Sequence, residues 1–322
     1  MSLSEISGVW QRLWEEDPLG DAENADRTTL VLWIQTPSGI YVDLRLPQRS
    51  LDLPRIKMGP SAIDGKGVAC SNEEFMDVLS CQKSFAGVLN YEHTNPDSCV
   101  TIQSDKILAN LNHNGPIPLS TCTWHRMIDS QPPTGSPDIG VCCASAPMGA
   151  DGSVDIRETG HDASYAEGWH RLPKTSNGPY MALELMSEER KGYWVRAGNH
   201  FAYAVGRPLH NRLDEYNVSS LQDLSKMSAI SMSEKAAIIG SYVCVAGSID
   251  EESDSWIIHH STHPELIGCE LAGTSESQTA CSFLEWKADE LLEETLHGGN
   301  GSRVWKVVQL DGCEAPVKNR GR

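Results

Sequence analysis

Short runs of aliphatic, aromatic and β-branched residues, several of them alternating apolar with polar, dominate the apolar parts of the chain. In the clearest run, Ile40–Leu46, every second residue is apolar, and Tyr41, Asp43 and Arg45 share the other face. A second such run, Thr29–Gln35, precedes it across a short turn with Pro and Gly. Alternation with a period of two is typical of a strand with two unlike faces, so this region predicts a β-hairpin.

Similar runs recur along both halves of the chain, separated by turn residues. In the first half, further strands are expected over 83–89, 121–129, 138–143, 154–158 and 165–172. In the second half they are expected over 180–186, 192–198, 200–206, 236–249, 255–260, 282–286 and 303–310. One short helix is expected over 220–228, and 287–297 is helix-like in composition. Because the long amphipathic helices of a parallel α/β sheet are missing, the pattern predicts an all-β protein of antiparallel barrels or sandwiches.

The best domain boundary is Pro173–Pro179, where Pro, Gly, Ser and Asn cluster between two strand-rich halves. It divides the 322 residues into a first domain over 1–173 and a second over 180–322, both of ordinary domain size. The segments 51–80 and 91–119 carry few strand signals and are predicted to be insertions in the first domain.

Charge and composition exclude several classes of function. A formal charge of −18 disfavours binding to nucleic acid or to an anionic membrane surface. No apolar run is long enough for a membrane-spanning helix, and the N-terminus lacks the pattern of a secretory signal. The ten cysteines are irregularly spaced without a CxxC motif, which predicts reduced thiols in a cytoplasmic protein.

Polar residues of the first half form the sharpest candidate pocket. Alternation places Tyr41, Asp43 and Arg45 on one strand face, and it places His125 and Asp129 together on another strand. A small barrel that holds one ligand combines aromatic walls with a few polar groups. The complete set of candidates in this pocket is Tyr41, Asp43, Arg45, Trp124, His125, Asp129, Glu158 and Tyr165. The competing interpretation is a surface ion pair, Asp43–Arg45, with a structural His125.

The second half offers a weaker set, in which serines and histidines recur at short spacing. Its candidates are Arg196, His200, Ser241, His259, Ser261 and His263. Nucleophilic catalysis needs a serine within reach of an oriented base, but the GxSxG motif is absent. His259 and His263 would be about 13 Å apart along a strand, too far to hold one metal ion. We therefore expect no metal and no cofactor.

Several segments, taken together, resemble the HRI family, named in yeast for a protein that interacts with a casein-kinase-1 homologue, and its uncharacterised bacterial relatives. In the first half these segments are Leu30–Trp33, Tyr41–Arg45, Phe85–Gly87, Trp124–Ser130, Asp138–Gly140, Glu158–Gly160 and Tyr165–Trp169. In the second half the likeness is looser, over Val195–His200, Ser220–Leu221 and Trp256–Pro264. The resemblance implies two tandem lipocalin-like (calycin-like) β-barrels and no established reaction.

Two functions are consistent with these observations. The first is a binding module that holds a small apolar or amphipathic ligand, a protein partner or both. The second is an enzyme of the isomerase, cyclase, lyase or hydrolase type, in which His125 acts as acid or base, Asp129 orients it and Arg45 stabilises a developing anion. An enzyme should carry a histidine or carboxylate with a strongly shifted pKa in a deep cavity. No motif identifies a specific reaction.

Overall fold

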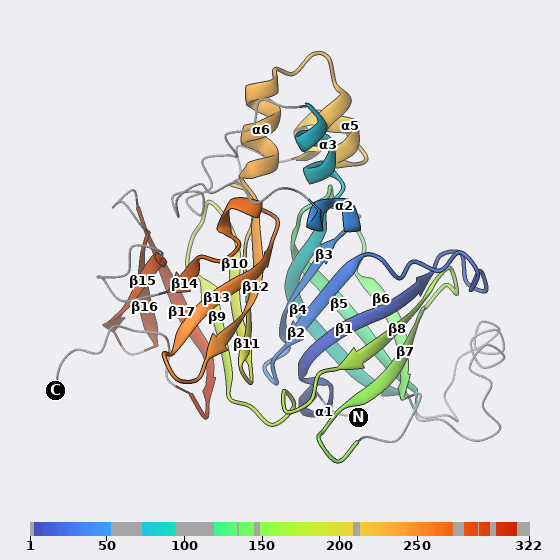
Figure 1. Ribbon diagram of the computed structural model, residues 1–322, viewed down its shortest axis with the longest axis vertical. Helices are drawn as coiled ribbons and strands as arrows, with labels where there is room; N and C mark the ends of the chain where they lie inside the picture. The colour runs from blue at the N-terminus through green and yellow to red at the C-terminus, as the bar shows by residue number, and fades with distance from the viewer. Residues whose placement is uncertain are drawn as a thin grey trace.

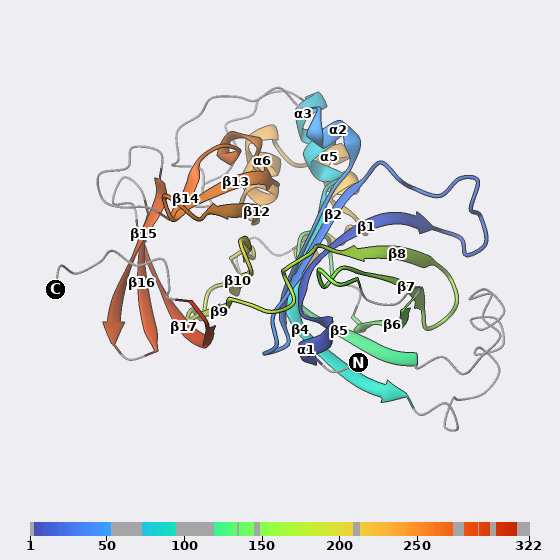
Figure 2. The ribbon, with the colours of Figure 1, turned by 60° about the horizontal axis from the view of Figure 1, so that its bottom comes forward.

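The computed structural model describes residues 3–52, 73–94, 119–133, 135–144, 149–208, 213–272, 280–288, 290–296 and 301–313. Two closed β-barrels lie side by side, one from each half of the chain (Figures 1 and 2). The predicted all-β fold of two barrels is therefore confirmed.

The first barrel contains eight strands, each antiparallel to its neighbours, and β8 pairs with β1 to close it. They are β1 (Gly8–Glu16), β2 (Leu30–Gln35), β3 (Ile40–Leu46), β4 (Lys83–Thr94), β5 (Leu119–Asp129), β6 (Asp138–Ala144), β7 (Val154–Gly160) and β8 (Ala166–Arg171). The short helix α1 (Leu3–Ile6) lies at one end, where the Ile6 carbonyl accepts a hydrogen bond from the buried Trp10 indole. Strand β1 was not expected from the sequence, and it supplies one of the site residues described below.

The second barrel closes where β17 pairs with β9, and it includes one parallel pair, β14 with β15. Its strands are β9 (Tyr180–Leu185), β10 (Gly192–Ala197), β11 (His200–Val205), β12 (Val243–Asp250), β13 (Ser255–Ser261), β14 (Glu270–Ala272), β15 (Ala280–Ala288), β16 (Leu291–Leu296) and β17 (Ser302–Asp311). The 3-10 turn η5 (Pro264–Leu266) follows β13. Part of the segment expected to be helix-like, 287–297, is strand β16.

Helices are more numerous than the one or two expected. Helix α2 (Gln48–Leu51) follows β3, and α3 (Glu73–Ser80) precedes β4. Between β11 and β12 lie η4 (Leu213–Tyr216), α5 (Leu221–Lys226) and α6 (Met232–Gly240). The strand expected over 236–249 is wrong in its first part, because Ser231 caps α6 by accepting a hydrogen bond from the Glu234 amide. Helices α3, α5 and α6 share a small apolar core above the two barrels (Figure 1).

The alternating hairpin strand explains how the barrels pack together. Ile40, Val42, Leu44 and Leu46 point out of the first barrel and are buried against the outer face of the second, formed by Tyr193, Val195, Ala197, Ala202 and Ala204. The other face of β3 therefore points into the first barrel. The segment between the barrels is only partly exposed, because Thr175 is buried and its hydroxyl accepts a hydrogen bond from the Val9 amide.

Candidate functional site

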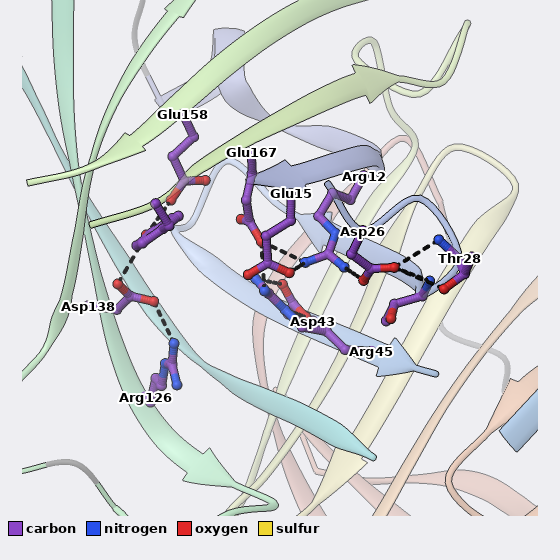
Figure 3. Close-up of polar contacts among 12 residues, drawn as sticks. Arg12, Glu15, Asp26, Thr28, Asp43, Arg45, Arg126, Asp138, Glu158 and Glu167 are labelled. Carbon is purple, nitrogen blue, oxygen red and sulfur yellow. Dashed lines mark hydrogen bonds and ion pairs between the residues drawn. The ribbon is translucent and has the colours of Figure 1, made fainter. Parts of the chain in front are cut away.

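The two ends of the first barrel differ in chemistry. The end next to α1 is filled by stacked and edge-to-face aromatic rings, with Trp33 in contact with Trp10, Trp124 and Trp169 at centroid distances of 5.7, 5.9 and 5.7 Å. The opposite end carries charged side chains from β1, β3, β5, β6 and β8 (Figure 3). We call this end the charged mouth.

Two arginines converge on one carboxylate in the charged mouth. Glu167 Oε1 on β8 accepts hydrogen bonds from Arg12 Nη1 and Arg45 Nη1, each at 2.9 Å. Arg45 also holds Asp43 on its own strand with two bonds, Nε to Oδ1 at 3.0 Å and Nη2 to Oδ2 at 3.2 Å. Arg12 Nη2 donates to Asp26 at 2.8 Å and Nη1 also pairs with Glu15. Paired charges of this kind tolerate burial far better than isolated ones.

These contacts change the acidity of the carboxyls in different directions. Burial raises the pKa of Asp43 above its usual value, although the Arg45 guanidinium opposes the rise. Burial also acts to raise the pKa of Asp26, but hydrogen bonds from Thr29 and Thr28 outweigh it and lower that pKa to about 2. Asp26 therefore stays ionised beside Arg12.

A second group of polar residues lies on the neighbouring wall. Arg126 on β5 pairs with Asp138 on β6 and, at 3.3 Å, with Asp129, while its guanidinium lies 3.9 Å from the centre of the Phe85 ring. The Tyr165 hydroxyl donates to Glu158 Oε1 at 3.0 Å and also lies 3.4 Å from Asp138 Oδ1.

Unlike the carboxylates paired with Arg12, Arg45 and Arg126, Glu158 has no basic partner within 4 Å in the described part of the chain. Burial, then the nearby Glu167 and Asp138 carboxylates, raise the pKa of Glu158 well above its usual value. Burial likewise raises the pKa of Asp129. The region thus combines carboxylates that are paired with arginines with one unpaired, buried carboxyl, Glu158, whose ionised form is disfavoured by burial and by its acidic neighbours.

An open cavity of about 500 Å³ occupies the charged mouth. Five carboxylates and three cations line it, namely Glu15, Asp17, Asp129, Asp138, Glu167, Arg45, Lys83 and Arg126. Phe85 and Tyr165 add aromatic surface, and Ser219 and Ser220 reach it from the second half of the chain. A neighbouring cavity of about 260 Å³ shares Glu15, Arg45 and Lys83. The wall of the first barrel's cavity is therefore built by both halves.

Most of the first-half candidates point into the first barrel. Those inside are Tyr41, Asp43, Arg45, Trp124, Asp129, Glu158 and Tyr165. His125 is the exception, because it lies on the outer face, where its Nε2 is 3.1 Å from the Asn90 side-chain amide.

A β-bulge explains this error. The pairing of β4 with β5 skips Met127, so the residues after it exchange faces with those before it. Strict alternation would have kept His125 and Asp129 together. The expected roles of His125 as acid or base and of Asp129 as its orienting group are therefore wrong.

The second-half candidates do not form one site. Arg196 covers the Trp256 ring at 5.5 Å, and Ser241 donates its hydroxyl to the Ile238 carbonyl at 2.8 Å. The Ser261 hydroxyl accepts a bond from the backbone amide of His263. The His263 ring is engaged by the Tyr242 carbonyl and by Glu265. His259 contacts Ser248 at 2.7 Å, and nearby His200 has its pKa lowered by burial and by His259. Neither candidate serine, Ser241 or Ser261, has a hydrogen bond to a histidine ring among the described residues, and Ser248, which contacts the His259 ring, was not a candidate.

Sequence reasoning missed the residues that complete the charged mouth, namely Arg12, Glu15, Asp26, Arg126, Asp138 and Glu167. Arg126 and Glu167 stand within the family-like segments, next to Trp124 and Trp169, so the family resemblance was the signal that could have found them. Arg12 carried no signal because its strand was not recognised. Across the described ranges, no group of three or more His, Cys, Asp or Glu side chains is arranged to hold a metal ion, and no helix is long and apolar enough to span a membrane.

Comparison with known proteins gives one family and one solved structure. The family model described as "Protein HRI1" matches residues 17–212. No curated protein matches the sequence. The crystal structure of an uncharacterised protein from Saccharomyces cerevisiae is similar over 94% of this chain and 98% of its own, at 12% identity and a TM-score of 0.47. The family match covers more than half of the chain.

Proposed function

The chain belongs to the HRI1 protein family, and we propose that it binds a small, polar, amine-bearing molecule in the charged mouth of its first barrel. The observation that carries the proposal is the excess of carboxylates over cations around a cavity of about 500 Å³. Concave sites of this size with a few fixed polar groups are typical of small-molecule binding.

The arginines of the mouth are already engaged, which determines the sign of the charge that a ligand meets. Arg45 uses Nε, Nη1 and Nη2 on Asp43 and Glu167, and Arg126 uses both terminal nitrogens on Asp129 and Asp138. The lining carboxylates outnumber the lining cations, and Asp17 has no ion pair in the described part of the chain, which favours a cationic group on the ligand. Phe85 supplies an apolar surface for a short hydrocarbon linker.

The proposed ligand is polar, whereas the sequence predicted an apolar or amphipathic one. The apolar end of the first barrel is occupied by its own tryptophans, and the interior of the second is filled by a cluster that includes Trp194, Trp256 and Trp305. The described apolar interiors thus offer a ligand little room, whereas the charged mouth is open. The protein partner expected from the sequence stays a prediction.

Calorimetric titration with three linear molecules of equal carbon number tests the charge argument. We expect 1,4-diaminobutane to bind, and 1,4-butanediol and succinate to bind at least ten times more weakly, since only the diamine places ammonium groups among the carboxylates. The affinity should fall as salt is added. Tighter binding of succinate, or no binding of the diamine, would overturn the proposed ligand class.

Two isosteric variants control for non-specific attraction to an acidic protein. Glu15→Gln should weaken diamine binding about tenfold, because it removes a carboxylate from the cavity wall. Glu285→Gln makes the same change of net charge on an exposed position of β15 and should leave binding unchanged. Equal effects of the two variants would mean that the whole protein's charge attracts the diamine, not the mouth.

One observation favours the second candidate function, an enzyme with acid–base chemistry. The carboxyl of Glu158, with its raised pKa, is joined through the Tyr165 hydroxyl to the wall of the cavity. A protonated carboxyl beside a polar cavity is an arrangement found in general acids. If the chain is an enzyme, mass spectrometry should detect conversion of a bound amine, and Glu158→Gln should abolish conversion while retaining binding. Unchanged conversion in that variant would exclude Glu158 as the acid.

A further inference from the structure

A small cavity lies where the two barrels and the helices α3, α5 and α6 meet, and it shares no lining residue with the cavity of the charged mouth. Its volume is about 10 Å³, which corresponds to one water-sized particle. Its walls come from Leu79, Gln82, Ser130, Arg207, Leu221, Ile239, Gly240, Tyr242, Thr262 and His263. We call it the junction cavity. Nearly all of these residues are buried, so whatever occupies the cavity is held inside the protein.

Arg207 brings to the junction cavity a positive charge that has no ion pair in the described part of the chain, although the Asp129 carboxylate acts on it from a longer distance. Its Nε donates to the Ile238 carbonyl at 3.1 Å and its Nη1 to the Asp129 carbonyl at 3.3 Å, so both contacts are to neutral backbone groups. Within the described part of the chain, no carboxylate oxygen lies within 4 Å of this guanidinium, in contrast to Arg12, Arg45 and Arg126. Burial lowers the pKa of Arg207 to about 10, and Tyr242 and the Asp129 carboxylate only partly oppose this effect, as expected of a guanidinium taken out of water without an ion-pair partner.

Two donors of cavity-lining residues have no acceptor among the described residues, Arg207 Nη2 and Gln82 Nε2. The hydroxyl of Tyr242, which also lines the cavity, lies beside the Ser84 and Cys244 side chains. Gln82 and Tyr242 are 4% and 2% exposed, so solvent at the surface does not satisfy them. Buried donors are almost always paired, because each unpaired one costs about 1–3 kcal/mol. Two unpaired donors and a hydroxyl around one small cavity indicate a common acceptor.

The residues that line the cavity indicate the charge of that acceptor. None of the described residues lining the junction cavity is Asp or Glu, whereas Arg207 is a cation. A polyatomic anion needs far more room than one water-sized particle. We infer that the junction cavity binds a single chloride ion, held by Arg207, Gln82 and Tyr242.

The inferred ion would have a structural role. Gln82 belongs to the first barrel's side of the junction, just before β4, whereas Arg207 and Tyr242 belong to the second half. One anion therefore joins donors from both halves of the chain. Its binding should stabilise the folded protein by mass action, and the stabilisation should saturate with halide concentration.

Bromide diffraction and thermal unfolding test this inference together. A crystal soaked in sodium bromide should show an anomalous peak between Arg207, Gln82 and Tyr242. At constant ionic strength, replacing sodium gluconate by sodium chloride should raise the melting temperature along a saturable curve. No anomalous peak, with equal melting temperatures in the two salts, would mean that the cavity holds water only and would overturn the inference.

A donor variant makes the test specific to this cavity. Gln82→Leu replaces an uncharged donor by an apolar side chain of similar size. We expect it to raise about tenfold the chloride concentration that gives half of the increase in melting temperature. The matched change Gln48→Leu on the exposed helix α2 should leave that concentration unchanged. An equal chloride response in wild type and Gln82→Leu would assign the salt effect to another place. Should Gln82→Leu fail to fold, the bromide peak in the wild-type protein decides the question.

Discussion

Removing the Arg45 guanidinium tests whether the ion pairs inside the first barrel are buried from water. Arg45 makes two bonds to Asp43 and one to Glu167, and these carboxylates are 3% and 2% exposed. Arg45→Met keeps most of the side-chain volume but leaves Asp43 buried without a cation, while Glu167 retains Arg12. Breaking a buried pair by deleting one partner costs about 3–5 kcal/mol. We expect a loss of that size in the free energy of unfolding at pH 7.5.

The pH dependence of the loss follows from Asp43. Burial already raises the pKa of Asp43 above that of the unfolded chain, and Arg45 limits the rise. Without Arg45 the pKa rises further, so the ionised carboxyl destabilises the fold above this new pKa. The penalty disappears as the pH falls through it, because the folded state then takes up the proton. The loss should therefore be clearly smaller at pH 5.0 than at pH 7.5.

Urea unfolding followed by tryptophan fluorescence measures both quantities. Arg49→Met is the matched control, because its ion pair with Asp77 is about half exposed and should contribute less than about 1 kcal/mol. Adding Asp43→Asn to Arg45→Met should recover part of the loss, since it removes the stranded charge. A loss below about 1 kcal/mol, or one independent of pH, would refute the view that these carboxylates are desolvated inside the barrel.

Four further measurements follow from the structure. Because the folded-state pKa of Glu158 is raised, ionisation of this carboxyl destabilises the fold at high pH. Glu158→Gln should therefore raise the melting temperature at pH 8, and the increase should disappear as the pH falls. A lower melting temperature of the variant at pH 8 would contradict this. His125→Ala should change the free energy of unfolding by less than about 0.5 kcal/mol, because the ring lies outside the barrel; a loss above about 2 kcal/mol would place it inside. Cleavage engineered within 173–179 should leave the halves together in gel filtration, since an apolar surface joins them; separate peaks would argue against that interface. All ten cysteines should react in denaturant without reductant, as the eight described ones are free; fewer than eight would indicate disulfides.

The sequence alone determined the fold class and which residues lie on each of the two faces of β3. Strand alternation is a local property, and by itself it separates Tyr41, Asp43 and Arg45 from their apolar neighbours. Alternation also failed for a local reason at Met127, where one extra residue in the strand moved His125 and Asp129 to opposite faces. Nothing in the composition of that strand indicated the bulge.

Only the tertiary structure decided which face of β3 is the inside of the barrel. An apolar face can fill a barrel or cover a neighbour, and both choices bury the same side chains at a similar gain in free energy. The second barrel covers this face, and its presence directs Asp43 and Arg45 inward to meet Arg12 and Glu167 from strands at the barrel's closure. These hydrogen bonds join residues that are more than a hundred positions apart in the chain. They depend on pairing between distant strands, which local sequence patterns do not encode.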